Sequence, residues 1–284
     1  IKSGPMTHNA HDAALALQVM AEHIPGSHYS VEYDGDVKGP PPFHLAGFEA
    51  TEDLSGVRLG VYDTWFDDSD PAIVKRCREA LDALVARGAE IVPISIPHLW
   101  KMSMAHALKI STEFAIAWDN TTSYKPESLE ANTAIQLQLG SVLRNLEVDA
   151  GQKIRRWGAN MLSGLYKDHR LSAIVTPTVS ILPPVLSPGA KATGESNTSL
   201  IVSMMKYIYL ANFLGLPGHT APVGTLPHPE TQVELPVGLH FLGAAWSEHV
   251  LLRLGNALDD VYGGIAKAHP STYFISGLLD PEHA

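Results

Sequence analysis

The stretch that decides the fold runs from residue 57 to residue 96 and reads VRLGVYDTWFDDSDPAIVKRCREALDALVARGAEIVPISI. Residues 57–61 alternate apolar and other side chains as a β-strand does. Asp70-Pro71 then supplies an N-cap and a favoured first helical residue, and Gly88 ends the helix. Residues 91–96 return as a second strand. A strand, a helix and a strand in this order are the building block of a parallel sheet, so the sequence predicts an α/β fold.

Other segments with helical spacing surround this unit. They run from Asn9 to about His23, over residues 99–118, 127–167 and 198–213, and onward from Ser247. In the segment 198–213 the apolar side chains cover most sides of the helix, so we expect it to be buried. The helix after Asp70 has one buried face instead, made by Ile73, Val74, Cys77, Leu81, Leu84 and Val85.

Three more strands complete the predicted sheet. Residues 173–175 are a short apolar run that leads into Thr176-Pro177-Thr178, where proline stops ladder pairing and turns the chain outward. Polar groups are thereby placed at the C-terminal edge of a strand, where open α/β sheets hold ligands. Residues 219–223 and 235–241 are predicted to pair across a Pro-rich loop. Residues 24–55 are rich in glycine and proline, which predicts a long surface loop.

The composition excludes several classes of partner. The chain has 284 residues with 45% hydrophobic and 18% charged side chains, as expected of a globular protein. Its formal net charge of -10 would repel nucleic acid. The single cysteine, Cys77, cannot form an internal disulfide, which favours a reducing, intracellular compartment. No apolar run approaches the roughly 18 to 20 residues that cross a bilayer.

Self-sufficient catalytic and metal motifs are weak or absent. Ser203-Met204-Met205-Lys206 fits a Ser-x-x-Lys pattern, in which a lysine amine one helical turn away acts as the base for serine. Its partner motifs Ser-Asp-Asn and Lys-Thr-Gly are missing, so we expect Ser203 to be an ordinary helix residue. His8 and His11 share a helical face without a zinc motif, and Asp34-Gly35-Asp36 lacks the rest of a calcium loop. We therefore expect no metal and no cofactor.

Four stretches, in their order along the chain, resemble the amidase-signature family of hydrolases. They are Gly4-Pro5-Met6 leading to Asp12-Ala13-Ala14-Leu15, Leu54-Ser55-Gly56-Val57-Arg58-Leu59-Gly60, Val175-Thr176-Pro177-Thr178, and Ala211-Asn212-Phe213-Leu214-Gly215-Leu216-Pro217 running to Leu235-Pro236-Val237-Gly238-Leu239. Within the family, Tyr62-x-x-Trp65-Phe66-Asp67-Asp68 and Gly194-Glu195-Ser196-Asn197-Thr198 are most similar to plant-type fatty acid amide hydrolases. The resemblance implies an α/β fold with a mixed twisted sheet and helices on both faces. It makes residues 1–284 the C-terminal part of one domain whose N-terminal part is missing.

The resemblance also implies a mechanism whose residues lie elsewhere. The family uses a nucleophilic serine, a second serine that relays the proton and a neutral lysine, with backbone amides of a Gly/Ser-rich loop holding the oxyanion. In family members these groups precede the segment that resembles Gly4-Pro5-Met6. No such loop occurs in this sequence, so no catalytic residue is carried over. We expect a segment upstream of Ile1 to supply them, because Gly4-Pro5 is typical of a loop inside a fold.

The substrate pocket is the part of the site that the resemblance assigns to this chain. Its expected substrate-binding residues are Thr176, Pro177, Thr178, Met205, Ile208, Asn212 and Leu143. The alternative is that these side chains only pack the sheet and helices. Leu139, Leu143 and Leu146 would line an acyl channel in the fatty-amide branch, or else serve as ordinary core leucines.

Two functional hypotheses from different classes follow. In the first, the chain is part of a serine amidase that hydrolyses a carboxylic amide. The narrower expectation for the substrate is a fatty acid amide or an N-acylethanolamine. The second is a catalytically inactive structural or binding subunit, which the departure at Thr7-His8-Asn9 from the family pattern favours. The expected partners are the small-molecule amide and the missing N-terminal segment, without which an apolar sheet edge would be exposed. A homodimer and a peripheral membrane contact are compatible with either hypothesis.

Overall fold

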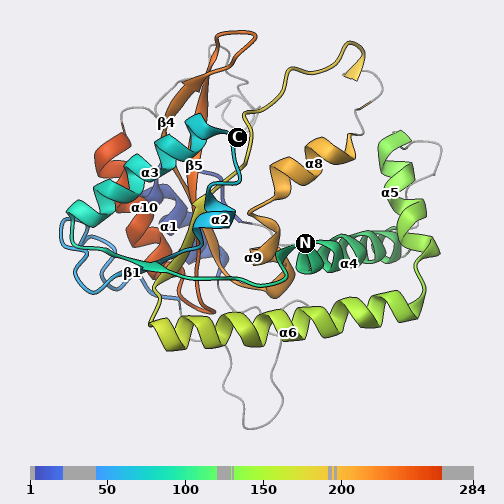
Figure 1. The fold of residues 1–284 in the computed structure, drawn as a ribbon, viewed down its shortest axis with the longest axis horizontal. Coiled ribbons are helices and arrows are strands. Elements are labelled where there is room, and N and C mark those ends of the chain that lie inside the picture. Colours follow the sequence, from blue (N-terminus) through green and yellow to red (C-terminus); the bar gives the residue numbers. More distant parts are fainter. Residues whose placement is uncertain are drawn as a thin grey trace, which may run out of the picture.

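The computed structural model shows a five-stranded mixed sheet with helices on both faces (Figure 1). It describes residues 4–21, 43–119, 129, 131–190, 194 and 197–263. The strands are β1 (Arg58–Val61), β2 (Glu90–Pro93), β3 (Ala173–Pro177), β4 (Gly218–Pro227) and β5 (Glu234–Leu242), in the order β2-β1-β3-β5-β4. The first three are parallel, whereas β5 runs antiparallel to both β3 and β4. The predicted strand-helix-strand unit, strand pair and mixed α/β fold are confirmed.

Helices α3 (Pro71–Ala86) and α10 (Glu248–Tyr262) cover one face of the sheet. The Asp70 carboxylate caps α3 by accepting a hydrogen bond from the Ala72 amide at 2.8 Å. Ile73, Cys77 and Leu84 are fully buried, as the helical spacing predicts, but Val85 at the end of the stripe is 42% exposed. The expectation of burial was wrong for Val85 because, at 3.6 residues per turn, it lies off the face that Ile73, Cys77 and Leu84 share.

The opposite face carries α4 (Leu99–Asp119), α6 (Asn145–His169) and α9 (Tyr209–Leu214). Two buried tyrosines fasten these helices to the backbone. The Tyr166 hydroxyl donates to the Leu242 carbonyl at 2.6 Å, and the Tyr209 hydroxyl donates to the Leu99 carbonyl at 2.8 Å. These bonds satisfy polar groups that would otherwise be costly to bury.

Two of the predicted helices are broken. The segment 127–167 forms α5 (Ala131–Val142) and α6, and the segment 198–213 forms α8 (Thr198–Met205) and α9. The second break lies at Tyr207, whose hydroxyl donates to the Trp65 carbonyl at 2.9 Å beside the carbonyl of Asp68 at 3.0 Å. This anchor next to the short helix α2 (Asp63–Phe66) fixes the bend. Helix α8 buries none of its residues, so its predicted burial on most sides was wrong.

Helix α1 (Ala10–Met20) packs against α10. The Asn9 side chain caps it by accepting from the Asp12 amide at 2.7 Å, and the Ala10 amide donates to the Asp259 carboxylate at 2.6 Å. The helix ends before the predicted His23. Of the predicted loop at 24–55, residues 43–55 are described and contain no helix or strand, while the rest and the Asp34-Gly35-Asp36 turn lie outside the described residues.

Helices α4 and α5 meet at Gly140, which gives a test of the packing. A Cβ atom at Gly140 would lie 2.0 Å from the Ser111 carbonyl oxygen, so we expect Gly140→Ala to lower the free energy of unfolding by about 1 to 3 kcal/mol. The matched control is Gly164→Ala in α6, where a Cβ meets nothing within 4 Å. Helix propensity alone should stabilise that variant by about 0.5 to 1 kcal/mol. Urea unfolding of both variants measures the difference, and equal effects would contradict the close contact.

Candidate functional site

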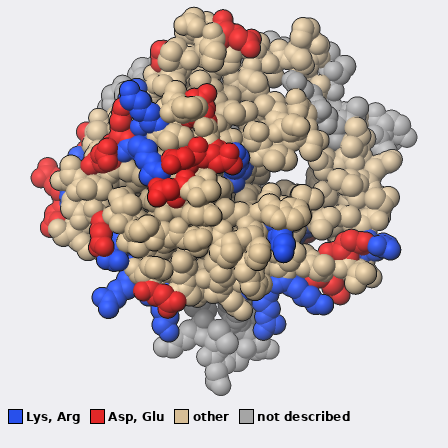
Figure 2. Space-filling model, in the orientation of Figure 1, with Lys and Arg blue, Asp and Glu red and all other residues tan. Residues whose placement is uncertain are grey.

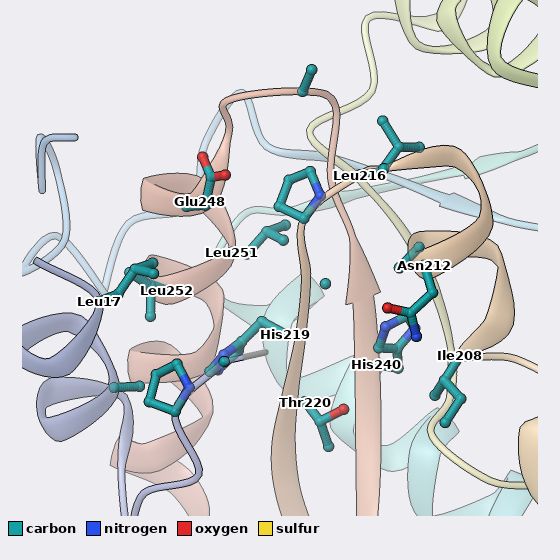
Figure 3. A pocket seen from close by; sticks show the side chains of 18 of the residues that line it. Leu17, Ile208, Asn212, Leu216, His219, Thr220, His240, Glu248, Leu251 and Leu252 are labelled. Carbon is teal, nitrogen blue, oxygen red and sulfur yellow. The ribbon is translucent and has the colours of Figure 1, made fainter. Parts of the chain in front are cut away.

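A pocket of about 760 Å³ opens beside β4, which is an edge strand of the described sheet (Figure 3). One wall comes from α9 and the turn that follows it, and the other from α1 and α10. The side chains labelled in Figure 3 are Leu17, Ile208, Asn212, Leu216, His219, Thr220, His240, Glu248, Leu251 and Leu252. Most of the wall is apolar, and Glu248 is the one acidic residue among those that line it. Gly4 and Pro5 line the same pocket.

His240 lies on the wall that faces α9. It stands opposite Thr220 in β4 and Thr176 in β3, so these three side chains share one face of the sheet. Gly218 makes room for it, since a Cβ at Gly218 would lie 2.9 Å from His240 Nε2. Figure 3 shows the Asn212 amide on the same side as the imidazole. The α9 wall therefore combines an amide, an imidazole and a hydroxyl.

His219 points to the opposite wall, toward Leu17 and Leu252 (Figure 3). It packs against α10 at Gly255, where a Cβ atom would lie 2.1 Å from His219 Nε2. Glycine in the middle of a helix costs about 1 kcal/mol relative to alanine. The helix contains glycine here in spite of that cost because no larger side chain fits beside this imidazole.

Both imidazoles are neutral at physiological pH. Burial lowers the pKa of His240 to about 4, and burial also lowers the pKa of His219, to about 4. His240 is 6% exposed, whereas His219 is partly accessible through the pocket. No described residue hydrogen-bonds either ring. A neutral imidazole offers one donor and one acceptor, so the pocket holds unused hydrogen-bonding capacity on both walls.

The structure brings some of the expected substrate-binding residues together. Ile208 and Asn212 line the pocket. Thr178 lies next to it, because its hydroxyl is 3.3 Å from the Thr220 hydroxyl. Thr176 is buried, and its Oγ1 has no hydrogen-bond partner among the described residues. Pro177 ends β3 opposite Leu239.

The remaining expected residues lie away from this pocket. Met205 is half-buried at the end of α8 and is not among the residues that line this pocket. Leu143 is half-buried in the turn between α5 and α6, at the far end of the helical layer (Figure 1). Its neighbours Leu139 and Leu146 are exposed, so they are not ordinary core leucines.

The charged side chains in Figure 2 gather instead over α2 and α3. There the Arg78 guanidinium bridges the carboxylates of Asp63 and Asp67, at 2.7 Å from each. In this view, the surface over α8 therefore has fewer charged side chains than the surface over α2 and α3.

The two histidines are the site residues that the sequence reasoning missed. Both stand in mostly apolar strands, and a histidine in such a strand is the signal that could have identified them. Both line one pocket, and the pairing of β4 with β5 decides which face of the sheet each of them takes. That pairing places His219 and His240 on opposite faces of the sheet.

Ser203 and Lys206 do not form a catalytic pair in the structure. The Ser203 hydroxyl donates to the Ser199 carbonyl of its own helix at 3.1 Å. The Lys206 ammonium contacts the Asp68 carboxylate at 2.9 Å and the Asp68 carbonyl at 2.7 Å. Lys206 is thus held by Asp68 and makes no hydrogen bond to the Ser203 hydroxyl in the described part of the chain.

Over the described ranges, no three His, Cys, Asp or Glu side chains cluster in a way that could hold a metal ion. None of the helices described here is long and apolar enough to cross a membrane.

Comparison with known proteins gives a consistent family. The family model for Amidase matches residues 2–252. A fatty acid amide hydrolase of Medicago truncatula is 29% identical over 95% of this chain and 43% of its own length. A fatty acid amide hydrolase of Oryza sativa subsp. japonica is 28% identical over 91% of this chain and 41% of its own length. An amidase of Pseudomonas putida is 27% identical, covering 78% of this chain and 46% of its own length.

Solved structures agree on the fold. A bacterial aryl acylamidase of the amidase-signature enzymes superimposes with a TM-score of 0.69 at 19% identity, covering 94% of this chain and 55% of that one. A chain from a vestigial protein complex related to an s-triazine catabolic enzyme reaches a TM-score of 0.71 at 21% identity, covering 93% and 54%. The chain thus spans about half the length of the curated relatives it matches.

The buried imidazole of His240 predicts a pH-dependent stability. Its pKa is about 4 in the folded state and about 6.5 when unfolded, so between these values the unfolded state binds more protons. The free energy of unfolding should therefore fall by about 3 kcal/mol between pH 7 and pH 4 from this residue alone. We expect His240→Gln, which cannot titrate, to melt with a shallower dependence on pH over this window. Identical pH profiles of melting temperature for the variant and the wild type would contradict the burial of a neutral His240.

Proposed function

The chain belongs to the amidase family, and from that premise we propose that it is part of a hydrolase of carboxylic amides. The observation that carries the proposal is the family match over residues 2–252. The sheet that holds Thr176 in β3 beside the strand pair β4–β5 supports it, because Thr178 and Asn212 then flank one region of the molecule.

We propose further that the reacting groups come from outside residues 1–284. A serine amidase needs a nucleophile, a proton relay and a neutral lysine, together with an oxyanion hole. The Ser203 hydroxyl and the Lys206 ammonium are engaged elsewhere, as described above. Two serines and a lysine from the remainder of the protein would complete the site, which fits a chain that covers about half of its relatives.

The narrower proposal for the substrate is a fatty acid amide or an N-acylethanolamine. The similarity to plant fatty acid amide hydrolases supports it, and so does the mostly uncharged surface beside α8 (Figure 2). In this proposal Thr176, Pro177, Thr178 and Asn212 flank the reacting carbonyl. Met205, Ile208 and Leu143 would contact the acyl chain.

A fluorophosphonate probe tests the catalytic proposal on the full-length gene product. We expect one serine to be labelled, outside residues 1–284, and an N-acylethanolamine to be hydrolysed. Labelling should persist in Ser203→Ala, because the Ser203 hydroxyl donates to its own helix. Absence of both labelling and hydrolysis would favour the alternative of a catalytically inactive binding subunit. Labelling of Ser203 itself would overturn the assignment of the nucleophile.

A peripheral membrane contact is a second part of the proposal. Ile135, Leu139 and Val142 recur four and three residues apart on α5, and all three are exposed, as is Leu146 after it. Such a stripe would insert shallowly into a membrane interface.

Sedimentation with phosphatidylcholine vesicles tests the membrane contact. Each apolar side chain that leaves water contributes about 1.5 to 3 kcal/mol when fully buried, so Leu139→Glu with Val142→Glu should lower partitioning at least about tenfold. The control is Val233→Glu, an exposed apolar residue just before β5, which should change little. Equal binding of all variants would refute the contact through α5.

A further inference from the structure

We propose that the contact between His44 and His249 is an acid-sensitive latch. It fastens one end of a surface segment beside the pocket at neutral pH and releases that end as the pH falls. The segment is residues 43–55, which we call the strap. The latch goes beyond the proposed function, because it depends only on contacts among the described residues and adds a response to pH.

The second half of the strap is fastened to α10 by hydrogen bonds that acid does not break. The Arg253 guanidinium donates to the carbonyls of Ala50 and Asp53, at 2.7 Å and 2.6 Å. The Asn256 amide donates to the Phe48 carbonyl at 3.2 Å, and the Phe48 side chain is buried. A guanidinium stays charged and an amide stays neutral over the pH range in which histidine titrates, so these bonds persist.

The first half of the strap depends on the two imidazoles. The rings of His44 and His249 lie 4.2 Å apart between centroids and are tilted by 44°. On either side of His44, the half-buried Phe43 and Leu45 pack against the small apolar cluster of α1 and α10. Among the described residues, no hydrogen bond or ion pair joins residues 43–47 to these two helices. The ring contact is therefore the polar fastening of this end.

The geometry gives two reasons why acid should weaken this contact. His44 Nδ1 accepts a hydrogen bond from the Ala46 amide at 3.4 Å, and protonation of Nδ1 removes this acceptor. Two protonated rings at this separation also repel each other. In agreement, burial and the neighbouring His44 lower the pKa of His249. A ring whose pKa is lower in the fastened state takes up protons more readily once released, so a fall in pH favours release.

The other charged groups nearby do not reverse this response. Glu248, the neighbour of His249 on α10, favours the protonated ring, but the pKa of His249 is lowered all the same. On α1, His11 Nε2 lies 3.5 Å from the Glu49 carboxylate, and protonation of His11 would strengthen this pair. This pair acts on the second half of the strap, so acid should release residues 43–47 and leave the remainder in place.

Release would change one wall of the pocket. Leu17 on α1 and Leu252 on α10 line the pocket, and they belong to the same apolar cluster as Phe43 and Leu45. When the first half of the strap leaves, these two wall residues lose part of their packing on the outer side. The pocket should therefore be easier to enter at acidic pH than at neutral pH.

Hydrogen–deuterium exchange on the full-length gene product, resolved to single amides, tests the latch. The Phe48 amide donates to the Leu45 carbonyl at 3.0 Å, whereas the Leu54 amide donates to the Arg87 carbonyl at 2.7 Å, away from the latch. After correction for the intrinsic effect of pH on exchange, protection of the Phe48 amide should fall about tenfold from about pH 8 to about pH 5, the order expected for like charges this close. Protection of the Leu54 amide should stay constant. Constant protection of both amides, or an equal fall at both, would overturn the latch.

Two substitutions separate the latch from other titrating groups. His44→Phe keeps a ring beside His249 but has no Nδ1 acceptor and no proton to gain, so protection of the Phe48 amide should no longer fall in acid. His11→Gln leaves both rings of the latch in place and should keep the fall. Both positions are exposed, so we expect both variants to fold. A fall that persists in His44→Phe, or that disappears in His11→Gln, would refute the latch.

Binding of the apolar dye anilinonaphthalene sulfonate measures the consequence for the pocket. Its fluorescence should rise from about pH 8 to about pH 5 in the wild type, and rise less in His44→Phe. Equal rises in the two proteins would reject the link between the latch and the pocket.

Discussion

The rest of the structure depends on the two-sided pairing of β3. This strand pairs in parallel with β1 through Leu59 opposite Ala173, and antiparallel with β5 through Thr176 opposite His240. Buried backbone groups must be hydrogen-bonded, and β3 satisfies this condition on both sides. Because β3 has a parallel neighbour on one side and an antiparallel neighbour on the other, it joins the strand-helix-strand unit and the β4–β5 pair in one sheet. Each face of that sheet then has its own apolar cluster, covered by α3 and α10 on one side and by α4, α6 and α9 on the other.

The same requirement is unmet at the other end of the sheet. At β4 the backbone and the side chains of His219 and His240 offer hydrogen bonds that the described residues do not use. Gly218 and Thr220 are exposed and His219 is partly so, which leaves these groups open to water at this edge of the sheet.

Local patterns in the sequence were enough for the parts of the fold with local causes. The alternation at residues 57–61 predicted β1, and the Asp70-Pro71 cap predicted the start of α3, since both depend on neighbouring residues. The break between α8 and α9 could not be predicted, because the Tyr207 hydroxyl is anchored at Trp65, 142 residues away in sequence. Of the site, Ile208 and Asn212 came from the family resemblance. The two histidines depend on strand register, which no local pattern reveals.

The contact between Gly255 and His219 ties two positions that are far apart in the chain. A side chain at 255 is compatible only with a smaller residue at 219, while the histidine demands glycine. Among homologues, the residues at positions 219 and 255 should therefore vary together, so that sequences with alanine at 255 lack histidine at 219. Such paired variation would record which branches of the family keep a histidine at this edge of the sheet, without any measurement of their activity.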